Sequence, residues 1–192
     1  RRQRQMCIRD REYIKTNIKD VWILKPHVFE DARGYFMETF RSEDFCANLG
    51  NVVFVQDNES KSSYGVLRGL HYQKGKWSQA KLVRVIEGRV LDVAVDLRKS
   101  SPTFGKHVAV ELSSENKLQL FIPRGFAHGF AVLSPTAVFA YKVDNRYEPS
   151  AEVSIRYDDS SVGIKWPIPK CDMILSEKDT SGKSFEEAEL FD

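Results

Sequence analysis

The sequence has few cysteines, and their spacing suits neither a metal site nor a disulfide framework. Its 192 residues include only Cys7, Cys46 and Cys171. Three cysteines so far apart match no zinc-ligand spacing and do not make the even-numbered framework of a disulfide-rich domain. Free cysteine behaves mostly as a small apolar residue. We therefore expect idle or buried thiols and a reducing, cytoplasmic environment.

The sequence also lacks a long apolar run and a long block of one charge. No run approaches the roughly 20 apolar residues that a transmembrane helix needs, and no apolar core of a signal peptide lies near the start. The net charge is +2, with acids and bases interspersed. This is not the basic face of a nucleic-acid-binding protein, so we expect neither a membrane nor a nucleic-acid partner.

Residues 1–11, RRQRQMCIRDR, differ from the rest because they are basic and show no strand pattern. Such a segment is typical of a nucleic-acid-binding arm or of a disordered or non-native extension. The second interpretation is favoured, because no other basic cluster accompanies it. Residues 12–192 are then expected to form a single domain, which their length allows.

The body of the sequence predicts many short strands and little helix. The strand segments are rich in Val, Ile, Phe and Tyr, which favour a pleated, half-buried surface. Many strands with little helix indicate a β-sandwich or barrel, and the fold class that we predict is all-β, a jelly roll with a few short helices. The predicted strands are residues 21–25, 35–40, 52–56, 66–72, 82–87, 89–96, 107–112, 118–122, 129–133, 137–143 and 153–157.

The connections give further expectations. Glu87 and Gly88 form a tight-turn signal that would join the strands on either side into a hairpin. A short helix is expected over residues 42–48, with Ser42 as its N-cap and Gly50 ending it. The segment after Pro169 is expected to be loop, with one helix over residues 184–190.

Of the four histidines, two have a context that indicates chemistry. His27 and His107 are expected at the surface or at a strand edge. His71 follows Arg68 by three positions, so a regular strand would put them on opposite faces. Glycine inside a strand often marks a bulge, and a bulge at Gly69 would turn both side chains toward one cavity.

The context of His128 resembles a cupin motif. The spacing Pro123-x-Gly125-x-x-His128 is similar to the second sequence motif of the cupins, a jelly-roll superfamily in which this His often binds metal. The first motif needs a His-x-His pair, and this sequence has Gln73 in place of the second His. A catalytic metal needs about three protein ligands, so we expect no metal.

Eight motifs together resemble the dTDP-4-dehydrorhamnose 3,5-epimerase family, metal-free members of the cupin superfamily. The resemblance extends in order from about Glu12 to Asp179. The motifs are Asp31-Ala32-Arg33-Gly34-Tyr35-Phe36, Phe54-Val55-Gln56-Asp57-Asn58, Leu67-Arg68-Gly69-Leu70-His71-Tyr72-Gln73, Lys81-Leu82-Val83-Arg84, Val93-Ala94-Val95-Asp96-Leu97-Arg98, Ser101-Pro102-Thr103-Phe104-Gly105, Pro123-Arg124-Gly125-Phe126-Ala127-His128-Gly129 and Gly163-Ile164-Lys165-Trp166-Pro167.

The resemblance implies roles for matching residues. His71 would be the general base, paired with the carboxylate of Asp179. Tyr141 would be the general acid on the opposite face of the sugar, and Lys81 the cation near the ketone oxygen. Substrate contacts are implied for Arg33, Glu38, Gln56, Asp57, Asn58, Arg68, His128, Glu152 and Lys178. It also implies a homodimer and a dTDP-sugar substrate.

The sequence departs from the family near Arg146. Family members often carry an aromatic residue there that stacks on the thymine base, whereas this sequence has Asn145-Arg146-Tyr147. Either Arg146 stacks through its planar guanidinium, or Tyr147 takes that place.

These residue types suit proton transfer next to a ketone. An imidazole has an ordinary pKa of about 6.5, which fits a base at neutral pH, and a phenol remains a proton donor there. The enolate oxygen needs a positive partner, which Lys81 and Arg68 supply. Arg33 and Arg68 would bind the diphosphate as bidentate partners. No cofactor is required. The alternatives are a mono-epimerase or ketoisomerase, a non-catalytic nucleotide-sugar binding module and a metal-dependent cupin oxygenase.

Overall fold

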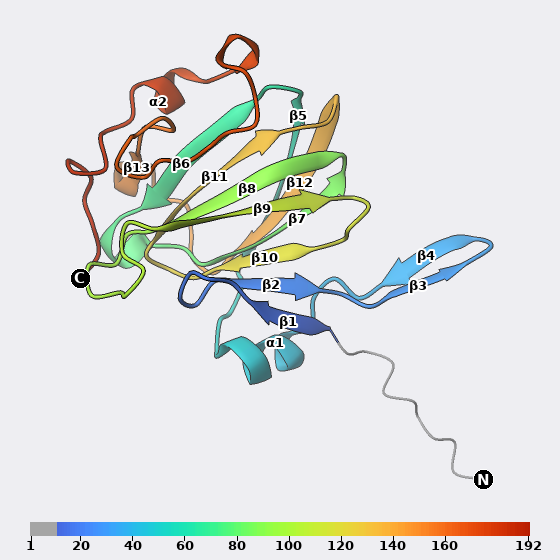
Figure 1. Cartoon of the computed structure of the whole chain (residues 1–192). Helices are drawn as coiled ribbons and strands as arrows, with labels where there is room; N and C mark the ends of the chain where they lie inside the picture. Colours follow the sequence, from blue (N-terminus) through green and yellow to red (C-terminus); the bar gives the residue numbers. More distant parts are fainter. Residues whose placement is uncertain (1–10) are drawn as a thin grey trace.

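Two antiparallel sheets face each other in the computed structural model, which describes residues 11–192 (Figure 1). The six-stranded sheet has the order β1-β2-β10-β7-β12-β5, and the five-stranded sheet has the order β13-β6-β11-β8-β9. The strands β3 and β4 form a separate hairpin that extends away from both sheets. This is the jelly roll of the cupin type that the sequence predicts.

The element bounds are as follows. The strands are β1 (Glu12–Lys15), β2 (Trp22–Lys25), β3 (Val28–Asp31), β4 (Gly34–Met37), β5 (Gln56–Ser63), β6 (Leu67–Gln73), β7 (Lys81–Glu87), β8 (Arg89–Asp96), β9 (His107–Ser113), β10 (Gln119–Ile122), β11 (Phe126–Val132), β12 (Thr136–Val143) and β13 (Glu152–Ser154). The helices are α1 (Ser42–Leu49) and α2 (Glu177–Thr180), with single 3-10 turns at Gly75–Trp77, Pro149–Ala151 and Lys170–Asp172.

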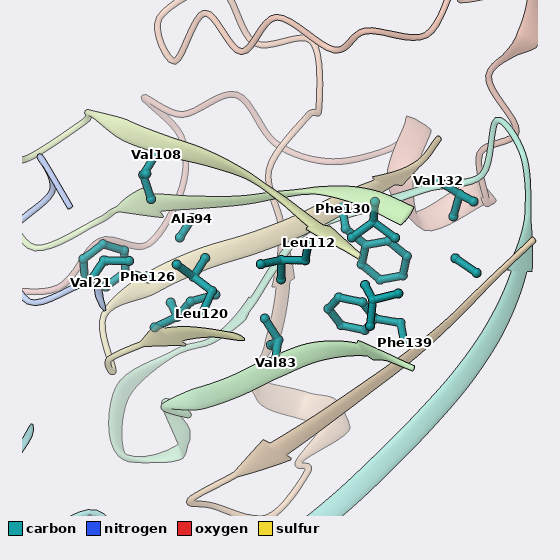
Figure 2. Close-up of a cluster of buried hydrophobic side chains, with 14 of the residues drawn as sticks. Val21, Val83, Ala94, Val108, Leu112, Leu120, Phe126, Phe130, Val132 and Phe139 are labelled. Atoms are coloured by element: carbon teal, nitrogen blue, oxygen red, sulfur yellow. The ribbon is translucent and has the colours of Figure 1, made fainter. Parts of the chain in front are cut away.

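The main core lies between the two sheets (Figure 2). The six-stranded sheet contributes Val83, Leu120 and Phe139, and the five-stranded sheet contributes Leu112 and Phe130 among others. The rings of Phe130 and Phe139 stack across the sandwich with centroids 4.3 Å apart. Full burial of one such side chain stabilises the fold by about 1.5–3 kcal/mol, so this layer holds the sheets together.

The five-stranded sheet is buried on its outer face as well. A second apolar cluster there joins Val93 and Val95 of β8 to Ile155, Val162 and other residues of the C-terminal segment. In Figure 1 this segment crosses the sheet on the side opposite the six-stranded sheet. Strand β8 therefore has no solvent face along most of its length, and its aspartates are buried too.

One predicted strand is wrong. Residues 52–56 were expected to be extended because of their valines, but the strand β5 begins at Gln56 and runs through polar residues to Ser63. Val53 and Val55 are exposed instead. Strand β5 is the edge of its sheet and largely faces solvent, so it carries no apolar alternation. Strands β1 and β3 were not predicted for a similar reason, since each is short and mostly accessible.

The expected hairpin at Gly88 is also wrong. Strand β7 pairs with β10 and β12, whereas β8 pairs with β9 and β11. The chain at Gly88 therefore passes from one sheet to the other. A Cβ atom at Gly88 would lie 2.1 Å from the carbonyl oxygen of Thr136, so close approach as well as the turn requires glycine.

The helices confirm one expectation and correct two. Helix α1 lies where it was predicted and ends at Gly50, but its N-cap is Arg41, which makes no side-chain cap bond, rather than Ser42. Residues 184–190 form no helix; they make a turn held by the bond from Ser184 to Glu187, and Phe191, just beyond them, forms an isolated bridge with Arg98. Helix α2 was not predicted.

Arg11 belongs to the folded part of the chain. Its Nη2 atom donates to the carbonyl of Glu38 at 2.9 Å, and its side chain is buried beside Asp44. The prediction that Arg11 belongs to an extension is therefore wrong; the rest of that segment, residues 1–10 with Cys7, lies outside the described residues. Cys46 and Cys171 are free thiols. None of the described helices has the length and apolar content that a membrane crossing requires.

Candidate active site

A cavity of about 570 Å³ opens between the sheets and is lined by the predicted catalytic residues. Residues of six strands and of α2 line it. The predicted site residues that line it are Arg68 and His71 of β6, Lys81 of β7, His128 of β11, Tyr141 of β12, Glu152 of β13, and Lys178 and Asp179 of α2.

A β-bulge in β6 brings Arg68 and His71 into this cavity, as the sequence predicts. His71 pairs with His128, but Arg68 pairs with Phe130, so β6 has one residue more than β11 in this interval. Gly69 lies in the bulge with φ of 129°, and a Cβ atom there would be 2.5 Å from the Cα atom of Gly129. Only glycine allows this backbone, and the extra residue turns both side chains to one side.

Asp179 holds the ring of His71. Its Oδ1 atom lies 2.8 Å from Nε2 of His71 and accepts the backbone N–H of Gly69 at 2.9 Å. Its Oδ2 atom accepts the backbone N–H of Ser176 at 3.0 Å and also the Ser176 hydroxyl. Burial alone would raise the pKa of Asp179, but the hydrogen bonds from His71, Ser176 and Gly69 lower it to about 2. Asp179 is therefore a carboxylate at neutral pH.

His128 forms a second buried pair. Its Nε2 atom lies 2.9 Å from Oδ1 of Asp92, whose side chain is fully buried. Burial lowers the pKa of His128, and the nearby charge of Lys81 acts in the same direction, while Asp92 opposes both. No motif in the sequence identifies Asp92 as the partner of His128. Only the fold brings β8 and β11 into register.

Burial shifts the pKa values of both Lys81 and Tyr141 in the cavity. Loss of water around the ammonium lowers the pKa of Lys81 to about 8, although the charges of Asp92 and Glu152 act in the opposite direction. Burial raises the pKa of Tyr141, with a smaller opposing effect from Arg68. Tyr141 therefore keeps its proton at neutral pH. Lys81, in contrast, can lose its proton at a pH only slightly above neutral.

Glu152 connects two residues, Lys178 and Tyr147, beside the cavity. Its Oε2 atom accepts from Nζ of Lys178 at 2.7 Å and from the hydroxyl of Tyr147 at 2.8 Å. Arg146 instead lies outside the cavity lining, beside Gln56 and Tyr147 in a separate depression. Tyr147 lines the same depression and is likewise absent from the cavity lining. It differs from Arg146 in that its half-exposed side chain is bonded to Glu152, which does line the cavity.

The three predicted contacts on β5 divide between two faces. Asn58 pairs with Tyr141 and Gln56 pairs with Val143, so both lie on the face of Tyr141, because directly opposite residues share a face. Their amides are joined by a hydrogen bond of 2.8 Å. Asp57 lies on the other face, where both its oxygens accept from Nζ of Lys142. None of the three lines the cavity itself.

Arg33 and Glu38 also lie away from the cavity. The guanidinium of Arg33 is 89% exposed at the tip of the β3–β4 hairpin and pairs only locally with Asp31 at 2.6 Å. Glu38 follows β4, and its carboxylate lies 3.5 Å from Nε of Arg41. The structure therefore does not bring these two predicted contacts to the cavity of their own chain.

Gln73 has a structural role at the position where a metal-binding cupin would carry a second histidine. It is buried, its amide nitrogen donates to the carbonyls of Trp77 and Arg146, and its oxygen accepts the N–H of Glu148. These bonds hold the segment that carries Tyr147. Within residues 11–192, no group of three or more His, Cys, Asp or Glu side chains is placed to hold a metal ion.

Comparison with known proteins identifies a family for this chain. The family model for dTDP-4-dehydrorhamnose 3,5-epimerase matches residues 15–187. The chain belongs to this family. A dTDP-4-dehydrorhamnose 3,5-epimerase of Shigella flexneri is 55% identical over 93% of this chain and 98% of its own length.

Solved structures of epimerases match the fold equally well. The dTDP-4-dehydrorhamnose 3,5-epimerase of Elizabethkingia anophelis NUHP1 is 58% identical with a TM-score of 0.89, and covers 92% of this chain and 97% of its own. The dTDP-6-deoxy-D-glucose-3,5-epimerase of Legionella pneumophila Philadelphia 1, solved in complex with dTDP-4-keto-L-rhamnose, is 48% identical with a TM-score of 0.90, covering 94% and 95%. The epimerase family thus accounts for the fold.

Proposed function

We propose that this chain converts dTDP-4-dehydro-6-deoxy-D-glucose into dTDP-4-dehydro-L-rhamnose by inverting C3 and C5. The observation that carries the proposal is the cavity in which the His71–Asp179 pair, Tyr141 and Lys81 meet. A base, an acid and a cation are the groups that inversion next to a ketone requires. The related Legionella enzyme was solved with the corresponding product-type sugar nucleotide.

The proposed steps follow from the placement of these groups. His71 takes the proton from C3 or C5, and the electrons of the broken C–H bond move into the C4 carbonyl to form an enolate. Because Nε2 of His71 is held by Asp179, the proton goes to Nδ1. Lys81 stabilises the enolate oxygen. The enolate then takes a proton from the Tyr141 hydroxyl on the opposite face, and exchange with water restores His71 and Tyr141.

Proton NMR of dTDP-4-dehydro-6-deoxy-D-glucose with the enzyme in heavy water tests this proposal. Deuterium at both C3 and C5 supports the double inversion, since each carbon loses its proton once. Label at one carbon indicates a mono-epimerase. A ketoisomerase would move the carbonyl, and a binding module would incorporate no label at all.

The variant His71→Asn is the matched control for the base. Asparagine keeps an amide near Asp179 but cannot accept the substrate proton, so we expect turnover and label incorporation to disappear while the sugar nucleotide still binds. Calorimetry with dTDP measures the binding. Normal turnover in this variant would remove His71 from the role of base.

We also propose that two chains form a homodimer in which Arg33 acts in the cavity of the partner subunit. Three features of the hairpin support this. It extends away from both sheets (Figure 1), its tip carries the exposed Arg33, and the rings of Tyr35 and Phe36 on β4 are 54% and 67% exposed. Exposed aromatic residues grouped on one element are typical of an interface, and a two-fold dimer would place two such hairpins reciprocally.

A further inference from the structure

We propose that Ser176 is a positioning residue for the His71–Asp179 pair, which extends the roles proposed above for those two residues. The carboxylate of Asp179 is 2% exposed, so all of its lone pairs must find partners inside the protein. Its two oxygens are held by different groups. His71 and the Gly69 N–H bind Oδ1, whereas Ser176 supplies both the bonds to Oδ2.

The bonds to Oδ2 fix the rotation of the carboxylate. A rotation that lengthened the bond from Ser176 would also move Oδ1 away from His71, because both oxygens turn about the same Cβ–Cγ bond. The imidazole would then lose the contact that sets its orientation. Ser176 therefore acts on the base through Asp179, without a role in the proton transfer itself.

The same contacts form the N-terminal cap of α2. Ser176 is the N-cap, its hydroxyl accepts the Asp179 N–H at 3.4 Å, and the Asp179 carboxylate accepts the Ser176 N–H. This is a capping box, in which the first and fourth residues satisfy each other's backbone donors. In α2 the fourth residue of the capping box is Asp179, which is also the partner of His71. One carboxylate thus uses Oδ2 for the helix and Oδ1 for the imidazole.

A helix of only four residues has little stability of its own, so the cap and the base pair depend on each other. Helix α2 is also tied to β13 by the bond from Lys178 to Glu152. A buried bond from the Gly69 N–H to Asp179 ties the helix to β6 as well, and both contacts remain available when the serine hydroxyl is removed. The effect of losing the hydroxyl should therefore fall on the orientation of Asp179 more than on the position of α2.

The test compares Ser176→Ala, Ser176→Gly and Ser176→Thr for kcat and KM. Alanine and glycine lack the hydroxyl, and glycine is the better tolerated N-cap, so it serves if the alanine variant folds poorly. We expect both to lower kcat about tenfold with KM nearly unchanged, which is typical of one lost hydrogen bond to a charged group. Threonine keeps the hydroxyl and should restore kcat.

Ser181→Ala is the control for helix stability. The Ser181 hydroxyl caps the other end of α2 by donating to the carbonyl of Glu177 at 2.7 Å, without touching Asp179. We expect wild-type kcat in this variant. An equal fall in kcat for Ser181→Ala and Ser176→Ala would assign the effect to the helix and overturn the proposal, as would wild-type kcat in both variants without the Ser176 hydroxyl.

A double-mutant cycle with Asp179→Asn shows whether Ser176 works through Asp179. If it does, Ser176→Ala should cost nothing further in the Asp179→Asn background, because coupled residues are not additive. An additive loss would contradict the inference. Full activity of Asp179→Asn and His71→Asn would instead show that the proposed base pair is wrong, so the two failures can be told apart.

Discussion

At the scale of single residues, Lys81 shows how burial tunes a charge for catalysis. Its ammonium lies in the cavity with the buried Asp92–His128 pair nearby, and burial lowers its pKa to about 8. A cation that is poorly solvated interacts more strongly with a developing enolate than one in water. The same burial means that Lys81 loses its positive charge at a lower pH than an exposed lysine does.

We therefore expect kcat/KM to fall as pH rises through about 8, because the free enzyme then loses the charge of Lys81. In Lys81→Arg the guanidinium stays charged, so this basic limb should disappear even if the rate is lower. Lys81→Met should lower kcat about 10²-fold or more, as loss of an oxyanion partner does. A pH–rate profile of the three proteins measures this. An unchanged basic limb in the arginine variant would assign the limb to another group.

The lowered pKa of Asp179 predicts a contribution to folding stability that is lost at acid pH. Its pKa is about 2 in the folded protein against an ordinary 3.8, so the folded state binds the proton less readily than the unfolded chain. The contribution, about 2 kcal/mol by linkage, is present above about pH 4 and is lost as the pH falls toward 2. Urea unfolding at several pH values should show the difference between wild type and Asp179→Asn narrowing in this range. A constant difference would contradict the assignment.

At the scale of secondary-structure elements, the bulge in β6 has the largest effect on the site. Without the extra residue, Arg68 and His71 would face opposite sides of the sheet. With it, both line the cavity. The bulge depends on the contact between Gly69 and Gly129, where two backbones approach too closely for any side chain.

Gly69→Ala should destabilise the protein by about 2–4 kcal/mol, since it combines an unfavourable φ with a backbone clash. Gly50→Ala is the control, because Gly50 also has a positive φ, of 90°, with nothing within 4 Å of an added Cβ, and lies outside the β3–β4 hairpin. The free energy of unfolding should fall more for Gly69→Ala than for Gly50→Ala, and the difference measures the clash. Equal losses would mean that φ alone accounts for the glycine.

The sequence predicted the bulge and most of the strands because both have local signals. Gly69 between Arg68 and His71 is such a signal, and so are the apolar residues of β7 to β12. It failed at β5, which is a polar edge strand, and at Gly88, where the turn joins two sheets. Ser176-x-x-Asp179 is the spacing of a capping box and could have located α2. The partnership of Asp92 with His128 depends on strand order, which no local pattern contains.

At the scale of the whole molecule, Arg33 is the residue whose predicted role and observed position differ most. The resemblance to the epimerase family implies that Arg33 binds substrate. In the structure it lies at the tip of a hairpin, away from the cavity lining of its own chain. A dimer would reconcile the two. The same dimer would cover the aromatic rings of β4, which are otherwise accessible to water.

Mixing two inactive variants tests this arrangement. In a hybrid of His71→Asn and Arg33→Ala chains, one cavity would hold an intact His71 and receive Arg33 from the partner. After unfolding and refolding together, about a quarter of the cavities should therefore be active, given random pairing of two-fold dimers. Each variant refolded alone is the control. No recovery of activity would indicate that Arg33 acts within its own chain or not at all.

The contact between β6 and α2 means that the base is anchored by a residue that is synthesised late. His71 and Gly69 are held by a carboxylate 110 positions beyond the glycine. A ribosome will have completed most of both sheets before it reaches Asp179. Until then the imidazole has no anchor, so we expect a chain shortened before Asp179 to contain every strand of both sheets but no anchored base.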